Sequence, residues 1–84
     1  MPYIDKNSRG KFDEFLNQIN KIDTKGELEY CLYKLMTIYM KDKEFKYSVL
    51  HDCTYGCIHA GDEFRRRNLD VRENEAREKN GDIL

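Results

Sequence analysis

The chain has few of the residues that crosslink or interrupt a small protein. Its 84 residues include three cysteines, one proline, five glycines and no tryptophan. An odd number of cysteines, and no apolar leader after Met1, argue against a secreted, disulfide-bonded domain. No apolar run approaches the roughly 20 residues that a membrane span needs. We therefore expect a cytoplasmic protein with reduced thiols and no membrane segment.

An excess of one charge is also lacking. The chain carries 15 Lys and Arg against 16 Asp and Glu, which gives a formal net charge of −1. Proteins that coat nucleic acid usually show a basic excess, so general nucleic-acid binding is disfavoured. A chain this short is marginally stable alone, and natural proteins of its size often add a metal or a partner subunit.

What is present is a helical pattern of apolar residues. In residues 8–22 these fall within one stripe at 100° per residue, and residues 25–42 and 46–67 repeat the spacing. Thr24 and Glu27 have the spacing of a capping box that starts the second segment. In the third segment the predicted core positions are Val49, Leu50, Cys53, Cys57, Ala60 and Phe64.

The end of the chain is polar on every face. Asp70 and Glu73 have capping-box spacing, and Asn80-Gly81 predicts a helix stop. Residues 70–84 therefore form a polar C-terminal tail or a short fourth helix, from Val71 to Lys79. The short connections favour antiparallel neighbours, so we expect an all-α fold: a small three-helix bundle over residues 1–69, followed by this tail.

His51, Cys53, Cys57 and His59 are all residue types that bind zinc. On one regular helix, however, the two thiols and the two imidazoles point in different directions. We therefore expect buried, reduced cysteines that pack as small apolar groups, and no metal site.

The opposite face of the third segment carries a second stripe. It mixes aromatic, aliphatic and titratable side chains: Tyr47, His51, Tyr55, Ile58, Asp62 and Arg65, flanked by His59 and Arg66. Such a mixture is either an ordinary solvated face or a surface for a subunit or ligand, where Tyr and Arg are enriched. On the second segment, Tyr30, Tyr33 and Met40 lie opposite the main apolar face and are further interface candidates.

Arg65, Arg66 and Arg67 form the only dense cationic cluster. An arginine side chain suits bidentate recognition of phosphate or carboxylate, although three consecutive helical positions cannot all contact one ion. The alternative is ordinary pairing with neighbouring carboxylates. Neither a nucleophile motif nor a phosphate-binding glycine loop is present, so we expect no catalytic residues, no cofactor and no enzyme activity.

Short patches of the sequence resemble a family of small uncharacterised proteins from tailed phages, bacteria and archaea. The patches are Met1-Pro2-Tyr3-Ile4, Gly26-Glu27-Leu28-Glu29-Tyr30, Glu63-Phe64-Arg65-Arg66-Arg67 and Asn80-Gly81-Asp82. The family pattern has tyrosine at the position of Arg65 and a proline-containing A-P-Y-E near Val71. The resemblance implies a phage or mobile-element setting, hence the host cytoplasm, and implies no particular activity.

Two functions fit these features. In the first, a homo-oligomer sequesters a small anionic ligand, such as a nucleotide messenger of host immunity. Arg66 and Arg65 would then bind phosphate while His51, Tyr55 and His59 stack on the base, with Tyr47 and Ile58 at the interface. In the second, the protein is an inhibitor or adaptor that binds a host protein through exposed aromatics and its C-terminal tail.

Overall fold

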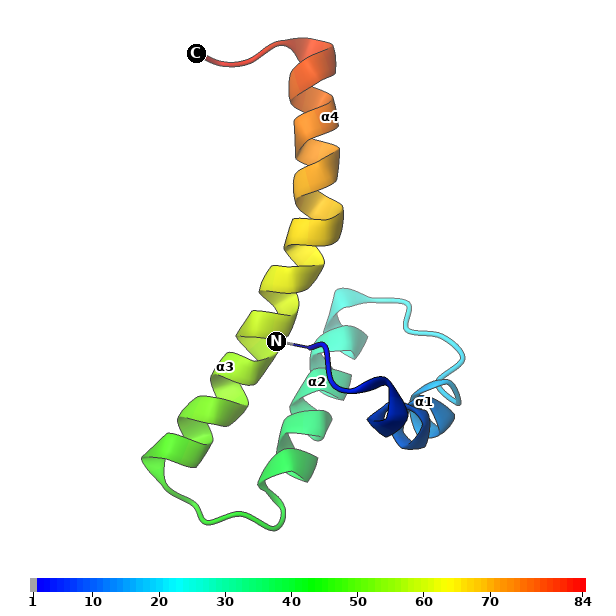
Figure 1. Ribbon diagram of the computed structural model, residues 1–84, viewed down its shortest axis with the longest axis vertical. Coiled ribbons are helices and arrows are strands. Elements are labelled where there is room, and N and C mark those ends of the chain that lie inside the picture. Colours follow the sequence, from blue (N-terminus) through cyan, green and yellow to red (C-terminus); the bar gives the residue numbers. More distant parts are fainter. Residues whose placement is uncertain (1) are drawn as a thin grey trace.

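The computed structural model describes residues 2–84, and Met1 lies outside the described part. Its elements, in order, are a 3-10 turn Lys6–Ser8, α1 Gly10–Leu16, α2 Lys25–Met40, α3 Tyr47–Phe64, a π-helical segment Arg65–Leu69 and α4 Asp70–Asn80. No strand occurs in residues 2–84. The predicted all-α class is therefore confirmed (Figure 1).

The start of α2 follows the predicted capping box. The Thr24 hydroxyl accepts a hydrogen bond from the Glu27 N–H at 3.0 Å. In return, the Glu27 carboxylate accepts from the N–H groups of Thr24 at 3.2 Å and Asp23 at 2.7 Å. These bonds occupy backbone donors that have no partner within the helix, and so they fix where α2 begins.

The first helix is shorter than its apolar stripe predicts. The helical pattern extends to Ile22, but α1 ends at Leu16. Asn17 and Asn20 are weak helix formers. The stripe also lacks a packing partner, since Phe12 and Phe15 are 49% and 68% exposed. Helices of this length persist mainly through tertiary packing, and this one has too little packing to extend further.

The third and fourth helices run on without a break, which corrects the predicted capping box at Asp70. Asp70 has helical angles, φ −64° and ψ −35°, and its N–H donates to the Arg65 carbonyl five residues earlier. An unbroken helix leaves no free N–H groups for the Asp70 side chain to cap, and none is capped. The predicted stop is confirmed, because Gly81 ends α4 with a φ of +90° that glycine adopts readily.

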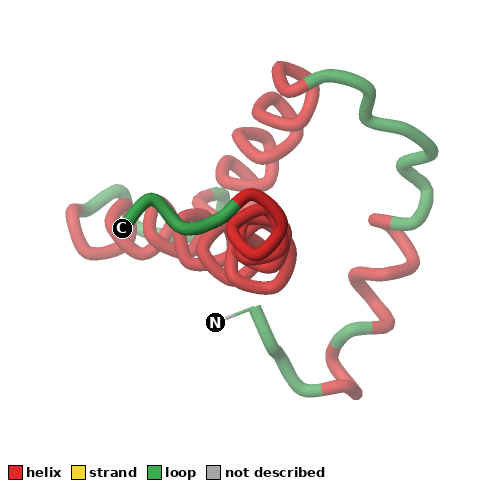
Figure 2. The backbone as a smooth tube through the Cα atoms, turned by 90° about the horizontal axis from the view of Figure 1, so that it is seen from above, coloured by secondary structure: helices red, strands yellow, loops and turns green. Residues whose placement is uncertain are grey.

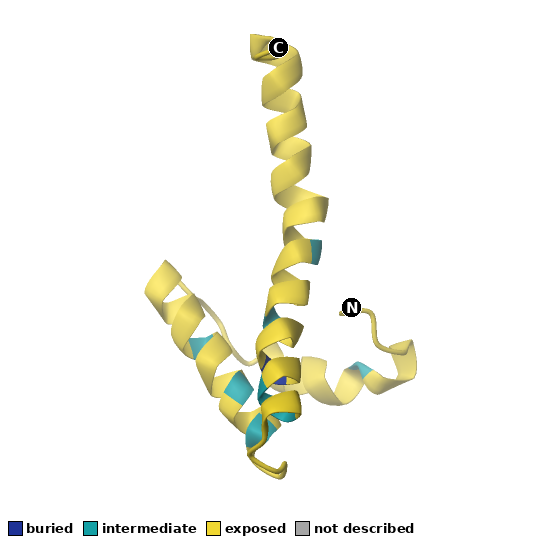
Figure 3. Ribbon diagram, turned by 90° about the vertical axis from the view of Figure 1, so that its left-hand side faces the viewer, coloured by how far each residue is buried: buried dark blue, intermediate teal, exposed yellow. Residues whose placement is uncertain are grey.

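Close packing between helices is confined to α2 and the first part of α3. Cys53 is the one buried apolar residue in the described chain, and its thiol lies 3.7 Å from the Met36 carbonyl. Of the predicted core positions, Val49, Leu50 and Cys57 are half-buried, whereas Ala60 and Phe64 are exposed. The prediction fails for those two because α2 and α3 diverge from the connection between them, so the last turns of α3 lie away from α2 (Figures 1 and 3).

The resulting shape is open. The radius of gyration is 16.7 Å, against about 12 Å for a compact domain of this length. The accessible surface is 7987 Å², about 2,700 Å² more than the roughly 5,300 Å² of a compact monomer of this mass. Seen from above, α1 and the loop that follows it swing away from the α2–α3 pair (Figure 2). A single protomer therefore leaves most of its apolar side chains in contact with solvent.

Candidate functional site

Four aromatic rings form a column along one face of α3. They belong to Tyr47, His51, Tyr55 and His59, which recur every four residues and therefore lie one above the other. The ring centroids are 5.8 Å apart for Tyr47 and His51, 4.2 Å for His51 and Tyr55, and 6.1 Å for Tyr55 and His59. The middle pair is stacked, with an interplanar angle of 20°. The predicted ligand residues His51, Tyr55 and His59 are thus brought together.

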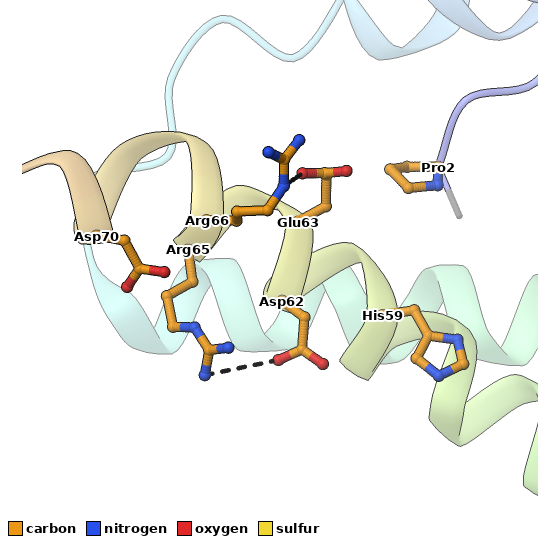
Figure 4. Close-up of a pocket in the computed structure, with 7 residues that line it drawn as sticks. All are labelled: Pro2, His59, Asp62, Glu63, Arg65, Arg66 and Asp70. Carbon is orange, nitrogen blue, oxygen red and sulfur yellow. Dashed lines mark hydrogen bonds and ion pairs between the residues drawn. The ribbon is translucent and has the colours of Figure 1, made fainter.

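The column ends at an open cavity of about 720 Å³. It is lined by Pro2, His59, Asp62, Glu63, Arg65, Arg66 and Asp70. In Figure 4, Arg65, Asp62 and His59 extend from the same side of α3, whereas Arg66 and Glu63 extend from the other. The two arginines thus reach the cavity from different directions, as expected for adjacent helical positions.

Both arginines already face carboxylates. Arg66 Nε donates to Glu63 Oε1 at 2.6 Å, and Arg65 Nη1 lies 3.9 Å from Asp62 Oδ1. The bond from Arg66 holds the pKa of the Glu63 carboxyl below its ordinary value, and the same bond raises the pKa of Arg66. The Arg65 pair is longer than a hydrogen bond and both side chains are more than half exposed, so it is loosely held.

The π-helical turn coincides with this arginine cluster. Residues 65–69 form it, and the Asn68 side-chain amide donates to the Phe64 carbonyl at 3.0 Å. Turns of this kind appear mostly as single insertions inside α-helices, frequently at functional sites. Here the turn changes the angular spacing of the arginines relative to α3. The regular 100° per residue assumed from the sequence therefore does not describe the segment.

Glu63 lines the cavity although the sequence did not indicate it as a ligand residue. Tyr3 and Arg67 line a neighbouring cavity, which shares Pro2 and Glu63 with the first. Arg67 Nη1 donates to the Tyr3 hydroxyl at 2.9 Å, across 64 positions of sequence. A hydrogen bond from Tyr3 also helps lower the pKa of Glu63. The sequence feature that points to this contact is that Tyr3 and Arg67 lie in two of the short patches that carry the family resemblance. These patches meet in space, and their contact places Pro2 at the cavity.

The residues predicted as interface positions fall on two separate surfaces. Tyr47 and Ile58 lie on α3 and are 81% and 44% exposed. Tyr30 and Tyr33 lie on α2 and are similarly exposed, whereas Met40 is half-buried at its end. Tyr33 and Met40 both line a cavity that lies between α2 and α3, away from the arginines.

The three cysteines are unpaired thiols of unequal exposure. Burial, together with the neighbouring Cys57, raises the pKa of the Cys53 thiol, so its neutral form is favoured. In residues 2–84, no three His, Cys, Asp or Glu side chains gather as a metal site would require. None of the described helices is long and apolar enough to cross a membrane.

The fold and this surface define a small, open, helical protein with an aromatic and arginine-bearing face. A family model described as a domain of unknown function (DUF6899) matches residues 1–83. The chain belongs to this family. No curated protein and no solved structure matches it.

Proposed function

We propose that the protein is a non-catalytic, homo-oligomeric binder that sequesters a small anionic ligand, in the manner of a phage protein that removes a nucleotide messenger of host immunity. The observation that carries this proposal is the aromatic column of α3, which leads directly into the arginine-lined cavity. The setting would be the cytoplasm of the host cell.

The column suits a planar ring. Tyr47 is 81% exposed and Tyr55 is 43% exposed, so both rings keep free surface although they lie within the column. Stacking of a base on an aromatic side chain contributes about 1–3 kcal/mol and tolerates any base. His51 and Tyr55 already show the near-parallel arrangement that an added ring would extend.

The cavity suits a ligand that carries phosphate and hydroxyl groups together. Arg65 and Arg66 can donate to phosphate oxygens, and phosphate competes well for arginine because the paired bonds match its geometry. Asp62, Glu63 and Asp70 also line the cavity and would repel a highly charged anion. The same carboxylates can accept hydrogen bonds from ribose hydroxyls, as acidic residues do in dinucleotide-binding folds. This mixture of arginines and carboxylates favours a nucleotide with few phosphates.

The test is native mass spectrometry of the purified protein, alone and with a panel of cyclic nucleotides and ADP-ribose-type compounds. We expect a discrete oligomer that gains the mass of one class of ligand. Arg66→Ala should lower affinity by at least about tenfold, since a charge-assisted bond contributes roughly 1.5–3 kcal/mol. Arg72→Ala, an exposed arginine of α4 outside the cavity, is the matched control and should bind normally.

Unchanged affinity in Arg66→Ala, with helicity preserved in circular dichroism, would contradict the assigned site. Absence of any adduct across the panel would contradict the ligand class.

One observation favours a protein-binding adaptor as the second candidate. Within the described residues, α4 contacts only the π-helical segment before it and projects away from the other helices (Figure 1). A free, highly charged helix of this kind could dock on a host protein. Deleting residues 71–84 should then abolish capture of that protein, whereas every residue that lines the cavity, Asp70 included, is kept.

A further inference from the structure

We infer that the groove between α2 and α3 is the surface on which a second copy of this chain docks. The inference rests on the homo-oligomer of the proposed function and not on its ligand. The groove holds about 340 Å³ and lies at the closed end of the α2–α3 hairpin. It is lined by Tyr33, Met36, Thr37, Met40, Lys41, Phe45, Leu50, Cys53 and Thr54.

The groove is apolar and open in the protomer. Its floor is Cys53, the buried residue, with Met36 and Leu50 half-buried beside it. Its rims are Tyr33 and Phe45, which are 68% and 84% exposed. Large rings exposed beside a packed floor are typical of the central anchors of a protein interface, where they fill a partner's pocket.

The exposed area indicates how much partner surface is missing. The protomer exposes about 2,700 Å² more than a compact monomer of its mass would. Obligate homodimers bury roughly 2,000–5,000 Å² over both partners together. This excess is spread over the whole chain, α1 and α4 included, and is large enough for an obligate assembly. The groove is the part of it where exposed rings stand beside two packed helices.

The charge favours a second copy over a charged partner. Lys41 is the one charged side chain lining the groove, so little there would select an acidic or basic protein. The chain as a whole has a formal net charge of −1, so two copies scarcely repel each other.

The geometry of the hairpin suggests how the copies meet. Two antiparallel helices cannot enclose an apolar groove by themselves, whereas two such hairpins face to face form a four-helix core. A two-fold contact would place the groove of one copy against the same groove of the other. The exposed rings of both copies would then be buried in the dimer. The aromatic column lies on another face of α3, which leaves the candidate ligand site free.

The first experiment measures mass at several protein concentrations by light scattering for wild type, Phe45→Glu and Tyr33→Glu. Both substituted side chains are largely exposed in the protomer, so each change removes little packing within the chain. A carboxylate buried in this apolar contact should raise the dissociation constant at least about tenfold, even where Lys41 of the groove pairs with it. Phe64→Glu is the matched control: Phe64 is 70% exposed but lies outside the groove, and this variant should assemble like wild type.

The second experiment needs no variant. Oxidative footprinting of the wild-type assembly should show Tyr33, Phe45 and Met40 protected, whereas Phe64 is modified at the rate its exposure implies. Rapid modification of Tyr33 and Phe45 in the assembly would overturn the inference, even if the variants fail to fold.

The outcomes separate this inference from the proposed function. An oligomeric Phe45→Glu variant overturns the docking surface and leaves ligand sequestration standing. A dissociated variant, beside a wild-type oligomer that binds no nucleotide, supports the docking surface and contradicts the ligand. A monomeric wild type at all concentrations overturns the docking surface and the oligomeric form of the proposal together.

Discussion

The two halves of the long helix that runs from Tyr47 to Asn80 differ in what holds them. The lower half packs against α2 through Leu50, Cys53 and Cys57, and its shape depends on tertiary contact. Within the described residues, the upper half, from Arg65 onward, packs against neither α1 nor α2. It meets the start of the chain through the bond from Arg67 to the Tyr3 hydroxyl. Its first arginines pair with carboxylates one turn earlier, as Arg66 does with Glu63. A single helix therefore combines a packed half with a solvent-exposed arm.

Among the substitutions that test this difference between the two halves, one at Cys53 should have the largest effect on stability. Cys53→Asp would place a charge in the one buried position of the described chain, where burial already favours the neutral form of the native thiol. Such a change should destabilise the hairpin by about 3 kcal/mol or more and leave a small protein largely unfolded. Far-ultraviolet circular dichroism with urea titration measures the loss.

Ala76→Asp in α4 is the control for the upper half, because Ala76 is exposed and packs on nothing. Its free energy of unfolding should stay within about 0.5 kcal/mol of wild type. If Cys53→Asp and Ala76→Asp lose equal free energy of unfolding, the two halves are equally packed in solution. That result would contradict the difference between them.

A smaller effect is expected at the start of α2. Thr24→Ala removes the hydroxyl that accepts from the Glu27 N–H. Loss of an N-cap should cost about 1 kcal/mol of unfolding free energy, measured by the same urea titration. Thr24→Ser, which keeps the hydroxyl, should restore most of it. A Thr24→Ser variant as unstable as Thr24→Ala would show that the cap does not stabilise the helix.

The smallest effect is expected where the two halves meet, at the Glu63–Arg66 pair. The bond from Arg66 lowers the pKa of Glu63 in the folded chain. Its contribution to stability is therefore present above the ordinary glutamate pKa of about 4.3 and is lost as pH falls through the lower folded value. Thermal unfolding between neutral and acidic pH should show a small advantage of wild type over Glu63→Gln at neutral pH, which disappears in acid. A difference in melting temperature between the two proteins that stays constant across this pH range would contradict a stabilising role for the pair.

The helical class and much of the candidate site could be predicted from spacing alone. The recurrence of Tyr47, His51, Tyr55 and His59 at four-residue steps predicts the column, because helix geometry alone stacks such positions. The Thr24–Glu27 cap and the Gly81 stop also depend on local geometry and are confirmed. The same periodicity predicts Ala60 and Phe64 in the core, but both are exposed. Periodicity shows which face a residue occupies and says nothing of whether another helix reaches that far.

The sequence by itself determined the local features: helix, cap, stop and the order of side chains along a face. Each follows from backbone hydrogen bonding and side-chain spacing within about one helical turn. Only the tertiary structure decided which faces are covered, that the helix continues through a π turn at Arg65–Leu69, and that Tyr3 meets Arg67. These outcomes depend on contacts between residues far apart in the chain, whose energies no local spacing encodes.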